Sequence, residues 1–329
     1  MAKTAVLMPN WVGDFAMALA VLLKRRAAGR DAPDLIVPTG LADLAGVLCD
    51  MRVIPYGRHG MRERLRTVSA LRRERYDTIY LLPHSFSSAL LAWLAGARRR
   101  RGIIRDGRRL LLSDPLPRAL RTSRAHLVRE YAAVLESEPP DVEEWPGRPV
   151  EPDPAWQGAV ALCPGAQFGP AKQWQGFGEL ARLLASRRMV IVGGPGDAQA
   201  GEAVAAAAGG SAVNLAGRTS LTQVVSVLAA ASCVVSNDSG LMHLAGFLGT
   251  PTVGIFGSTR PSWTRPLGRR VEVLYAGVEC SPCFDRACRY GHYRCLTSIT
   301  PQQVAGAVQR VSAMPSSGER TQARPELPR

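Results

Sequence analysis

Short apolar runs alternate with longer amphipathic segments along the first part of the chain. We expect buried strands at 4–9, 35–38, 51–55 and 78–83. Helical spacing of apolar residues predicts helices at 15–28, 60–75, 86–97 and 123–137. Strands that alternate with helices in this way are typical of a parallel sheet covered by helices, and therefore of an α/β fold.

A proline-rich, acidic stretch at 137–158 interrupts this alternation, and the same rhythm then restarts. We expect further strands at 159–164, 189–194, 212–217, 233–238 and 252–257. Further helices are expected at 174–187, 197–208, 220–231 and 239–248. The pattern predicts two doubly wound, Rossmann-like domains at 1–150 and 151–314, which face a central cleft, and a disordered polar tail at 315–329.

Length and composition agree with two globular domains. A chain of 329 residues exceeds the roughly 250–300 residues at which single cores stop growing. Hydrophobic residues make up 46% of the chain and charged residues 21%, which is ordinary for a globular protein. The sequence shows neither a transmembrane run nor the features of a signal peptide, so we expect a cytoplasmic protein.

The charge balance is unusually basic, with a formal net charge of +14. The densest cluster is RRRRGIIRDGRR at 98–109. We expect its patch of arginines to meet a phosphate-rich partner, and the candidates are Arg98, Arg99, Arg100, Arg101 and Arg105. The alternative is a solvated face. Because no aromatic residues are interleaved, nucleic acid is not expected as the partner, which leaves anionic lipid or a phosphorylated glycan.

Four of the seven cysteines fall within CSPCFDRACRYGHYRC, at Cys280, Cys283, Cys288 and Cys295. In the cytosol such density favours metal or redox chemistry over disulfides. A structural metal and a reduced cluster both stay open, and no catalytic metal is expected. The other three cysteines lie singly in apolar settings and are expected in the core.

The first strand ends in PNWVGDFAMA, where Gly13 permits a tight turn and Asp14 begins the next helix. Asp14 is either a helix cap or a functional carboxylate, and Trp11 beside it is a candidate wall for a ligand. No GxGxxG motif follows this strand, which argues against a nicotinamide dinucleotide site.

Glycine-rich loops follow the strands of the second half. In CPGAQFGPAKQW, the loop from Gly165 precedes Lys172, an arrangement that suits an anion unless Lys172 is simply a surface residue. In VGGPGDAQ, Asp197 is placed to accept from a ribose or to cap a helix. Thr219 and Ser220, in AGRTSL, stand at another strand end that turns into a helix.

The stretch SNDSGLMHLAG at 236–246 places a polar turn directly at a helix start. Ser239 and the free N–H groups from Gly240 onward can bind a diphosphate. Asp238 would repel a phosphate, so we expect it to cap the turn or to orient its neighbours, while His243 is a candidate donor to the ligand. This distribution predicts a nucleotide-sugar donor on the second domain and an acceptor on the first, with Asp14 between them.

Taken together, NWVGDFAMA, PGAQFGPAKQW, NDSGLMH and the cysteine-rich segment resemble the ADP-heptose:lipopolysaccharide heptosyltransferases over most of residues 4–300. The nearest branch adds the second inner-core heptose. The resemblance implies a GT-B fold and an inverting transfer of L-glycero-D-manno-heptose from ADP-heptose to the first heptose of lipid A–Kdo–heptose. It also implies no cofactor, and a site of action at the anionic inner face of the inner membrane, as a peripheral protein.

The resemblance also implies roles for individual residues. Asp14 matches the family's proposed general base, and Lys172 matches the lysine that meets the donor diphosphate. The donor-binding turn is matched by Asp238, Ser239, Gly240, Leu241 and His243. Asp197, Thr219 and Ser220 are looser matches, near the ribose and adenine. Two other hypotheses stay open: a transferase or epimerase for another nucleotide sugar, and a non-catalytic protein that binds nucleotide sugars or a membrane surface.

Overall fold

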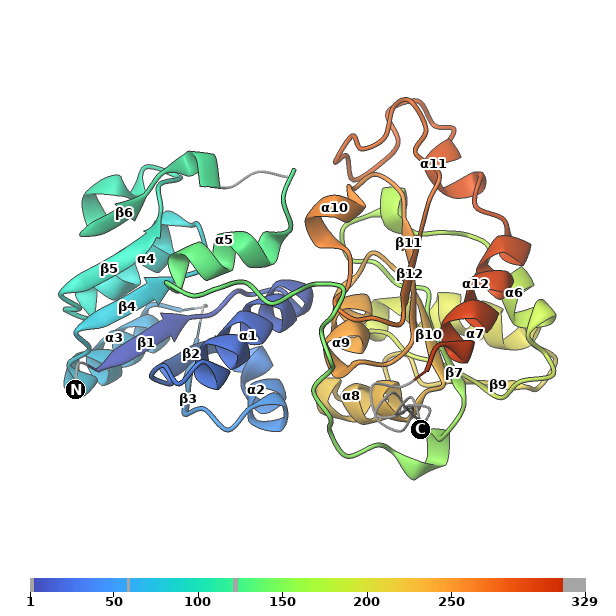
Figure 1. Cartoon of the computed structure of the whole chain (residues 1–329), viewed down its shortest axis with the longest axis horizontal. Helices are drawn as coiled ribbons and strands as arrows, with labels where there is room; N and C mark the ends of the chain where they lie inside the picture. The colour runs from blue at the N-terminus through green and yellow to red at the C-terminus, as the bar shows by residue number, and fades with distance from the viewer. Residues whose placement is uncertain (1–2, 58–59, 121–123, 316–329) are drawn as a thin grey trace, which may run out of the picture.

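The computed structural model describes residues 3–57, 60–120 and 124–315. The chain builds two six-stranded sheets, and all paired strands run parallel. The two sheets lie side by side, each with helices on both faces (Figure 1). This is the pair of doubly wound domains that the alternating pattern predicts.

The first sheet has the order β3-β2-β1-β4-β5-β6. Its strands are β1 (Thr4–Leu7), β2 (Asp34–Pro38), β3 (Val53–Tyr56), β4 (Thr78–Leu81), β5 (Arg99–Ile103) and β6 (Asp114–Leu116). The helices are α1 (Val12–Ala27), α2 (Ala42–Leu48), α3 (Met61–Glu74), α4 (Phe86–Leu94) and α5 (Leu127–Val134). Central strands are apolar on both faces because helices cover both sides.

The second sheet has the order β12-β11-β10-β7-β8-β9. Its strands are β7 (Val160–Cys163), β8 (Met189–Ile191), β9 (Ala212–Asn214), β10 (Cys233–Asn237), β11 (Thr252–Phe256) and β12 (Val271–Tyr275). The helices are α6 (Phe177–Leu183), α7 (Ala198–Ala207), α8 (Leu221–Ala230), α9 (Gly240–Leu248), α10 (Pro261–Thr264), α11 (Arg294–Thr297) and α12 (Pro301–Ala313). Short 3₁₀ turns occur at Thr39–Leu41, Arg108–Leu111, Arg118–Leu120, Pro154–Trp156, Pro170–Lys172 and Pro195–Asp197.

Every strand predicted from an apolar run is present, with slightly shorter bounds. Three strands were not predicted: β5, β6 and β12. Strand β5 begins with three arginines, which hide it from any search for apolar runs. Arg99 and Arg101 point to one face, where both pair with Asp114. Alternation along a strand sends Arg100 to the opposite face, where its Nε donates to the carbonyl of Leu111 at 2.7 Å.

The two halves meet mainly through α1 and α9, which pack against each other. The segment between α5 and β7 also docks on the second half, where Trp145 stacks on Phe247 with ring centroids 5.6 Å apart. Nε1 of Trp145 donates to the Phe247 carbonyl at 2.8 Å. The boundary predicted at 150 falls in this segment, and the tail predicted from 315 lies, beyond Pro315, outside the described residues.

None of the helices in the described part of the chain combines the length and apolarity that crossing a bilayer requires.

Candidate active site

The carboxyl ends of the strands of the second sheet bring several loops to one edge. Asn237, the last residue of β10, ties two of these loops together. Its Nδ2 donates to the Pro164 carbonyl at 2.7 Å, and its Oδ1 accepts from the Trp174 backbone at 3.1 Å. The loop that carries Lys172 is therefore held against the end of β10. Trp174 precedes α6 rather than lying on it as predicted, and its ring is buried.

Asp238 is the centre of the polar cluster at this edge. Lys172 Nζ lies 2.5 Å from its Oδ2, and Thr259 Oγ1 donates to the same oxygen at 2.5 Å. His243 Nε2 lies 3.7 Å from Oδ1. Burial raises the pKa of Asp238, but the hydrogen bond from His243 and the charge of Lys172 outweigh burial and lower the pKa to about 2. Asp238 is thus an ionised anchor that orients its neighbours, one of the two roles predicted for it.

The N-terminus of α9 lies next to this cluster. Ser239 is the N-cap residue, but its side chain makes no capping hydrogen bond and instead lies 3.0 Å from Ser236 Oγ. The first-turn N–H groups, from Gly240 and Leu241 onward, are therefore not used by the cap. Such groups, at the positive end of the helix dipole, are suited to bind an anion.

Asp197 organises a neighbouring part of the same edge. Its Oδ2 accepts from the Gly194 backbone at 2.8 Å. Gly165 passes so close that a methyl group added there would lie 2.3 Å from the Asp197 carboxylate oxygens. Only glycine fits at this position, and Asp197 holds the loops after β7 and β8 together.

Thr219 and Ser220 already have local partners. Ser220 Oγ accepts from the Gln223 backbone at 3.2 Å, and its own N–H donates to Gln223 Oε1 at 2.8 Å, which makes a capping box for α8. Thr219 Oγ1 donates to the Leu215 carbonyl at 3.4 Å. No contact in the described residues joins either side chain to the Asp238 cluster.

Across the interface, Asp14 stands in the first turn of α1. The N-cap of this helix is Trp11, so Asp14 is not the cap. Its Oδ1 accepts from the Tyr131 hydroxyl of α5 at 3.2 Å. The adjacent Gly13 touches the ring of His243, which brings the turn that carries Asp14 beside the start of α9. Trp11 is 60% exposed at the same end of α1.

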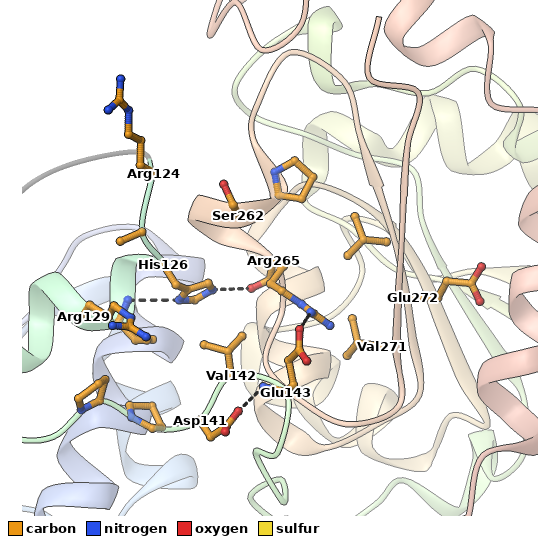
Figure 2. Close-up of a pocket in the computed structure, with 16 residues that line it drawn as sticks. Arg124, His126, Arg129, Asp141, Val142, Glu143, Ser262, Arg265, Val271 and Glu272 are labelled. Atoms are coloured by element: carbon orange, nitrogen blue, oxygen red, sulfur yellow. Dashed lines mark hydrogen bonds and ion pairs between the residues drawn. The ribbon is translucent and has the colours of Figure 1, made fainter.

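A cleft of about 960 Å³ opens beside this junction, between α5 and the following segment on one side and α10 and β12 on the other (Figure 2). His126 crosses it: Nε2–H donates to the Arg265 carbonyl at 2.9 Å, while Nδ1 accepts from the Val128 backbone at 3.3 Å. Burial lowers the pKa of His126 to about 4, so the ring is neutral at pH 7. Arg124 and Arg129 also line the cleft.

Comparison with known proteins decides the family. Residues 64–294 match the model of glycosyltransferase family 9 (heptosyltransferase). The chain belongs to this family. It is 32% identical to lipopolysaccharide heptosyltransferase 2 of Escherichia coli K12, over 92% of this chain and 96% of that protein. It is 30% identical to lipooligosaccharide heptosyltransferase 2 of Haemophilus influenzae, over 81% of this chain and 86% of the relative.

The solved structure of E. coli ADP-heptose LPS heptosyltransferase II superposes with a TM-score of 0.79. The match is 30% identical and covers 94% of this chain and 98% of that one. The predicted GT-B fold is therefore confirmed. The chain is a glycosyltransferase, which excludes the epimerase and the non-catalytic binding protein among the hypotheses that the sequence left open.

The arginine patch predicted on this glycosyltransferase is not one surface. Arg98 and Arg105 flank β5 at opposite ends, about 20 Å apart at the rise of a strand. Between them, Arg99 and Arg101 pair with Asp114, and Arg100 donates to backbone carbonyls. These three side chains fasten β5 to its own domain. A 3₁₀ turn just beyond buries Arg108 completely, a cost offset by its bonds to the Ile103 carbonyl and Ser88.

Three contacts at the site were missed from the sequence. Thr259 follows a strand end that was noted for its polar residues, so its position was available as a signal. Tyr131 and His126 lie in or before α5 with no distinguishing motif. Only the packing of α5 beside α1 and α10 makes them part of the site.

Proposed function

We propose that the protein is an inverting transferase that moves L-glycero-D-manno-heptose from ADP-heptose to the first heptose of the lipopolysaccharide inner core. Family membership supports the reaction class. The observation that carries the assignment of roles is the junction of α1 and α9, where Asp14 of one half adjoins the Lys172–Asp238–His243 cluster of the other.

The donor is proposed to bind at the loop edge of the second sheet. Its diphosphate would meet the first-turn N–H groups of α9 and the ammonium of Lys172. Lys172 spends one of its three donors on Asp238 and keeps the others for the ligand. An opposite charge at about 4 Å contributes about 4 kcal/mol at an effective dielectric constant near 20. This stabilises the charge that develops on the departing ADP.

The nucleoside part of the donor is assigned to the neighbouring loops. Gly165, Asp197, Thr219 and Ser220 lie along the ends of β7, β8 and β9. Asp197 is proposed to accept from the ribose hydroxyls. Because Ser220 caps α8, its contribution would be to shape the loop rather than to bind through its hydroxyl.

Asp14 is proposed as the general base. Its carboxylate would take the proton of the acceptor hydroxyl while that oxygen attacks the anomeric carbon from the face opposite ADP, which inverts the configuration. The hydrogen bond from Tyr131 orients one carboxylate oxygen and disfavours its protonation at rest. No cofactor is needed for this displacement.

The acceptor, lipid A–Kdo–heptose, is proposed to enter through the cleft of Figure 2. Arg124 and Arg129 line its wall on the first half and suit the anionic groups of an inner core. The two acids at this cleft with printed ion-pair partners, Glu143 and Glu272, pair with Arg265 and Arg310. We also propose that the protein works at the anionic cytoplasmic face of the inner membrane, as its net charge favours.

Donor preference tests this function. Purified protein is offered ADP-heptose, ADP-glucose and UDP-glucose in turn, with and without the heptose-terminated acceptor, and release of nucleoside diphosphate is measured. The proposal expects release only with ADP-heptose and acceptor together. Faster turnover of either glucose donor on the same acceptor contradicts it.

A further inference from the structure

The cysteine-rich segment lies outside the chemistry proposed above. Residues 276–293, between β12 and α11, form neither helix nor strand. The segment nevertheless packs on the loop that carries Lys172: the Ala171 backbone donates to the Arg286 carbonyl at 3.1 Å. The ring of Phe168 lies between Lys172 and Arg286, 4.9 Å and 5.3 Å from their charged groups. A long irregular segment in this position requires something that holds its shape.

The four cysteines of the segment converge. Cys280, Cys283, Cys288 and Cys295 all line one cavity of about 20 Å³. That volume suits a single ion and is too small for an organic cofactor. All four are free thiols, so no disulfide provides the cross-link.

Cys288 has the surroundings of a thiolate. The backbone N–H of Tyr293 leads a group of amides, with those of Tyr290, His292 and Gly291, that lowers the pKa of the Cys288 thiol. Consecutive amides that converge on one sulfur stabilise negative charge there, as in a backbone nest. The segment also carries three arginines against two carboxylates, which favours an anionic centre.

His292 is not needed as a ligand. Its Nδ1 already accepts from the Arg294 backbone at 3.0 Å, which places the ring proton on Nε2. The same Nδ1 lies 3.9 Å from Cys288 Sγ, so the ring supports that sulfur from beside it.

We propose that Cys280, Cys283, Cys288 and Cys295 form a structural site for one Zn²⁺ ion, held by four thiolates. Across residues 3–57, 60–120 and 124–315, no three such side chains already stand as a complete ligand set, so the thiols must turn inward on binding. Each thiol that binds releases its proton, and four sulfurs leave no open position on the ion. The site is therefore structural, and its role is to hold the segment against the loop of Lys172.

Metal analysis of the whole protein tests the site without reference to activity. Purified under reducing, oxygen-free conditions, the protein is expected to contain about one zinc per chain. Exchange for Co²⁺ is expected to give the visible bands of a tetrahedral ion and the near-ultraviolet charge transfer of thiolate ligands. Chelation is expected to lower the melting temperature, and added zinc to restore it.

Variants assign the ligands. C283S and C288S are expected to lose the zinc and the Co²⁺ bands, whereas C49S, which alters a buried thiol of the first half, keeps both. If a variant fails to fold, the zinc content and Co²⁺ spectrum of the unaltered protein still decide. Zinc well below one per chain with no thiolate–cobalt bands overturns the proposal, as does iron in its place. Neither result bears on whether the protein transfers heptose.

Discussion

Gly13 in the first turn of α1 lies directly against the ring of His243 in the first turn of α9. A methyl group added at Gly13 would stand 2.4 Å from His243 Cδ2, closer than any van der Waals contact permits. His243 in turn faces Asp238, whose Oδ1 is 3.7 Å from its Nε2. The residue beside Asp14 is therefore in contact with the cluster that holds Lys172, although the two belong to different domains.

The change G13A is expected to disturb this junction. An added methyl forces His243 or α1 to shift, which costs about 1–3 kcal/mol of unfolding free energy and slows transfer. The matched control is G46A, in α2, where an added methyl meets nothing within 4 Å. Alanine is the better helix former there, so G46A gains about 0.5–1 kcal/mol and keeps its rate. Urea titration and an ADP-release assay compare the two. Equal behaviour of both variants would show that the contact is slack.

The Lys172–Asp238 pair is expected to behave as a buried pair. K172M leaves the Asp238 carboxylate without its cation and is expected to cost roughly 3 kcal/mol of unfolding free energy. The double variant K172M/D238N should lose less than the two single variants add up to, by about 0.5–3 kcal/mol. ADP affinity, measured by calorimetry, should fall with K172M.

The control for this pair is K3M, which breaks the more exposed pair of Lys3 and Glu74. Its cost is expected to stay below about 1 kcal/mol. Strict additivity of K172M and D238N, together with unchanged ADP affinity, would mean that the two charges act independently.

His126 is expected to make stability depend on pH. Its pKa is about 4 in the folded protein against 6.5 in the ordinary range, so the unfolded chain takes up the proton first as the pH falls. The stabilisation is complete above pH 6.5 and is lost progressively between 6.5 and about 4. Between about pH 7 and pH 5 the loss is about 2 kcal/mol.

H126Q isolates this effect, because glutamine retains a donor for the Arg265 carbonyl and does not titrate. The unfolding free energy of H126Q should fall less than that of the unaltered protein over the same pH range. Parallel curves for the two proteins would assign the pH dependence to other groups.

The layout of the donor edge could be predicted from the sequence for a physical reason. Apolar runs that end in glycine or a polar residue report both a buried strand and the turn that follows it. In a parallel sheet all such ends share one edge. Asp238 was expected to orient neighbours because a carboxylate repels phosphate, and the structure identifies those neighbours as Lys172, Thr259 and His243.

Partners from distant parts of the chain could not be predicted in the same way. Tyr131 reaches Asp14 across 117 positions, and nothing local to either residue signals the contact. The strand β5 escaped detection because its arginines find buried or paired positions only once Asp114 and Glu136 are folded beside them. A run of like charges indicated an exposed patch, and tertiary pairing reversed that interpretation.

The role of Asp14 as base is the central claim, and the rate of transfer by D14N tests it most directly. Acceptor-dependent release of ADP from ADP-heptose is measured for D14N and for D43N, which alters an exposed carboxylate in the first turn of α2. The account predicts that D14N lowers kcat by about 10²–10⁴ with ADP affinity unchanged, and that D43N matches the unaltered protein. A D14N enzyme that turns over at a near-normal rate would contradict it.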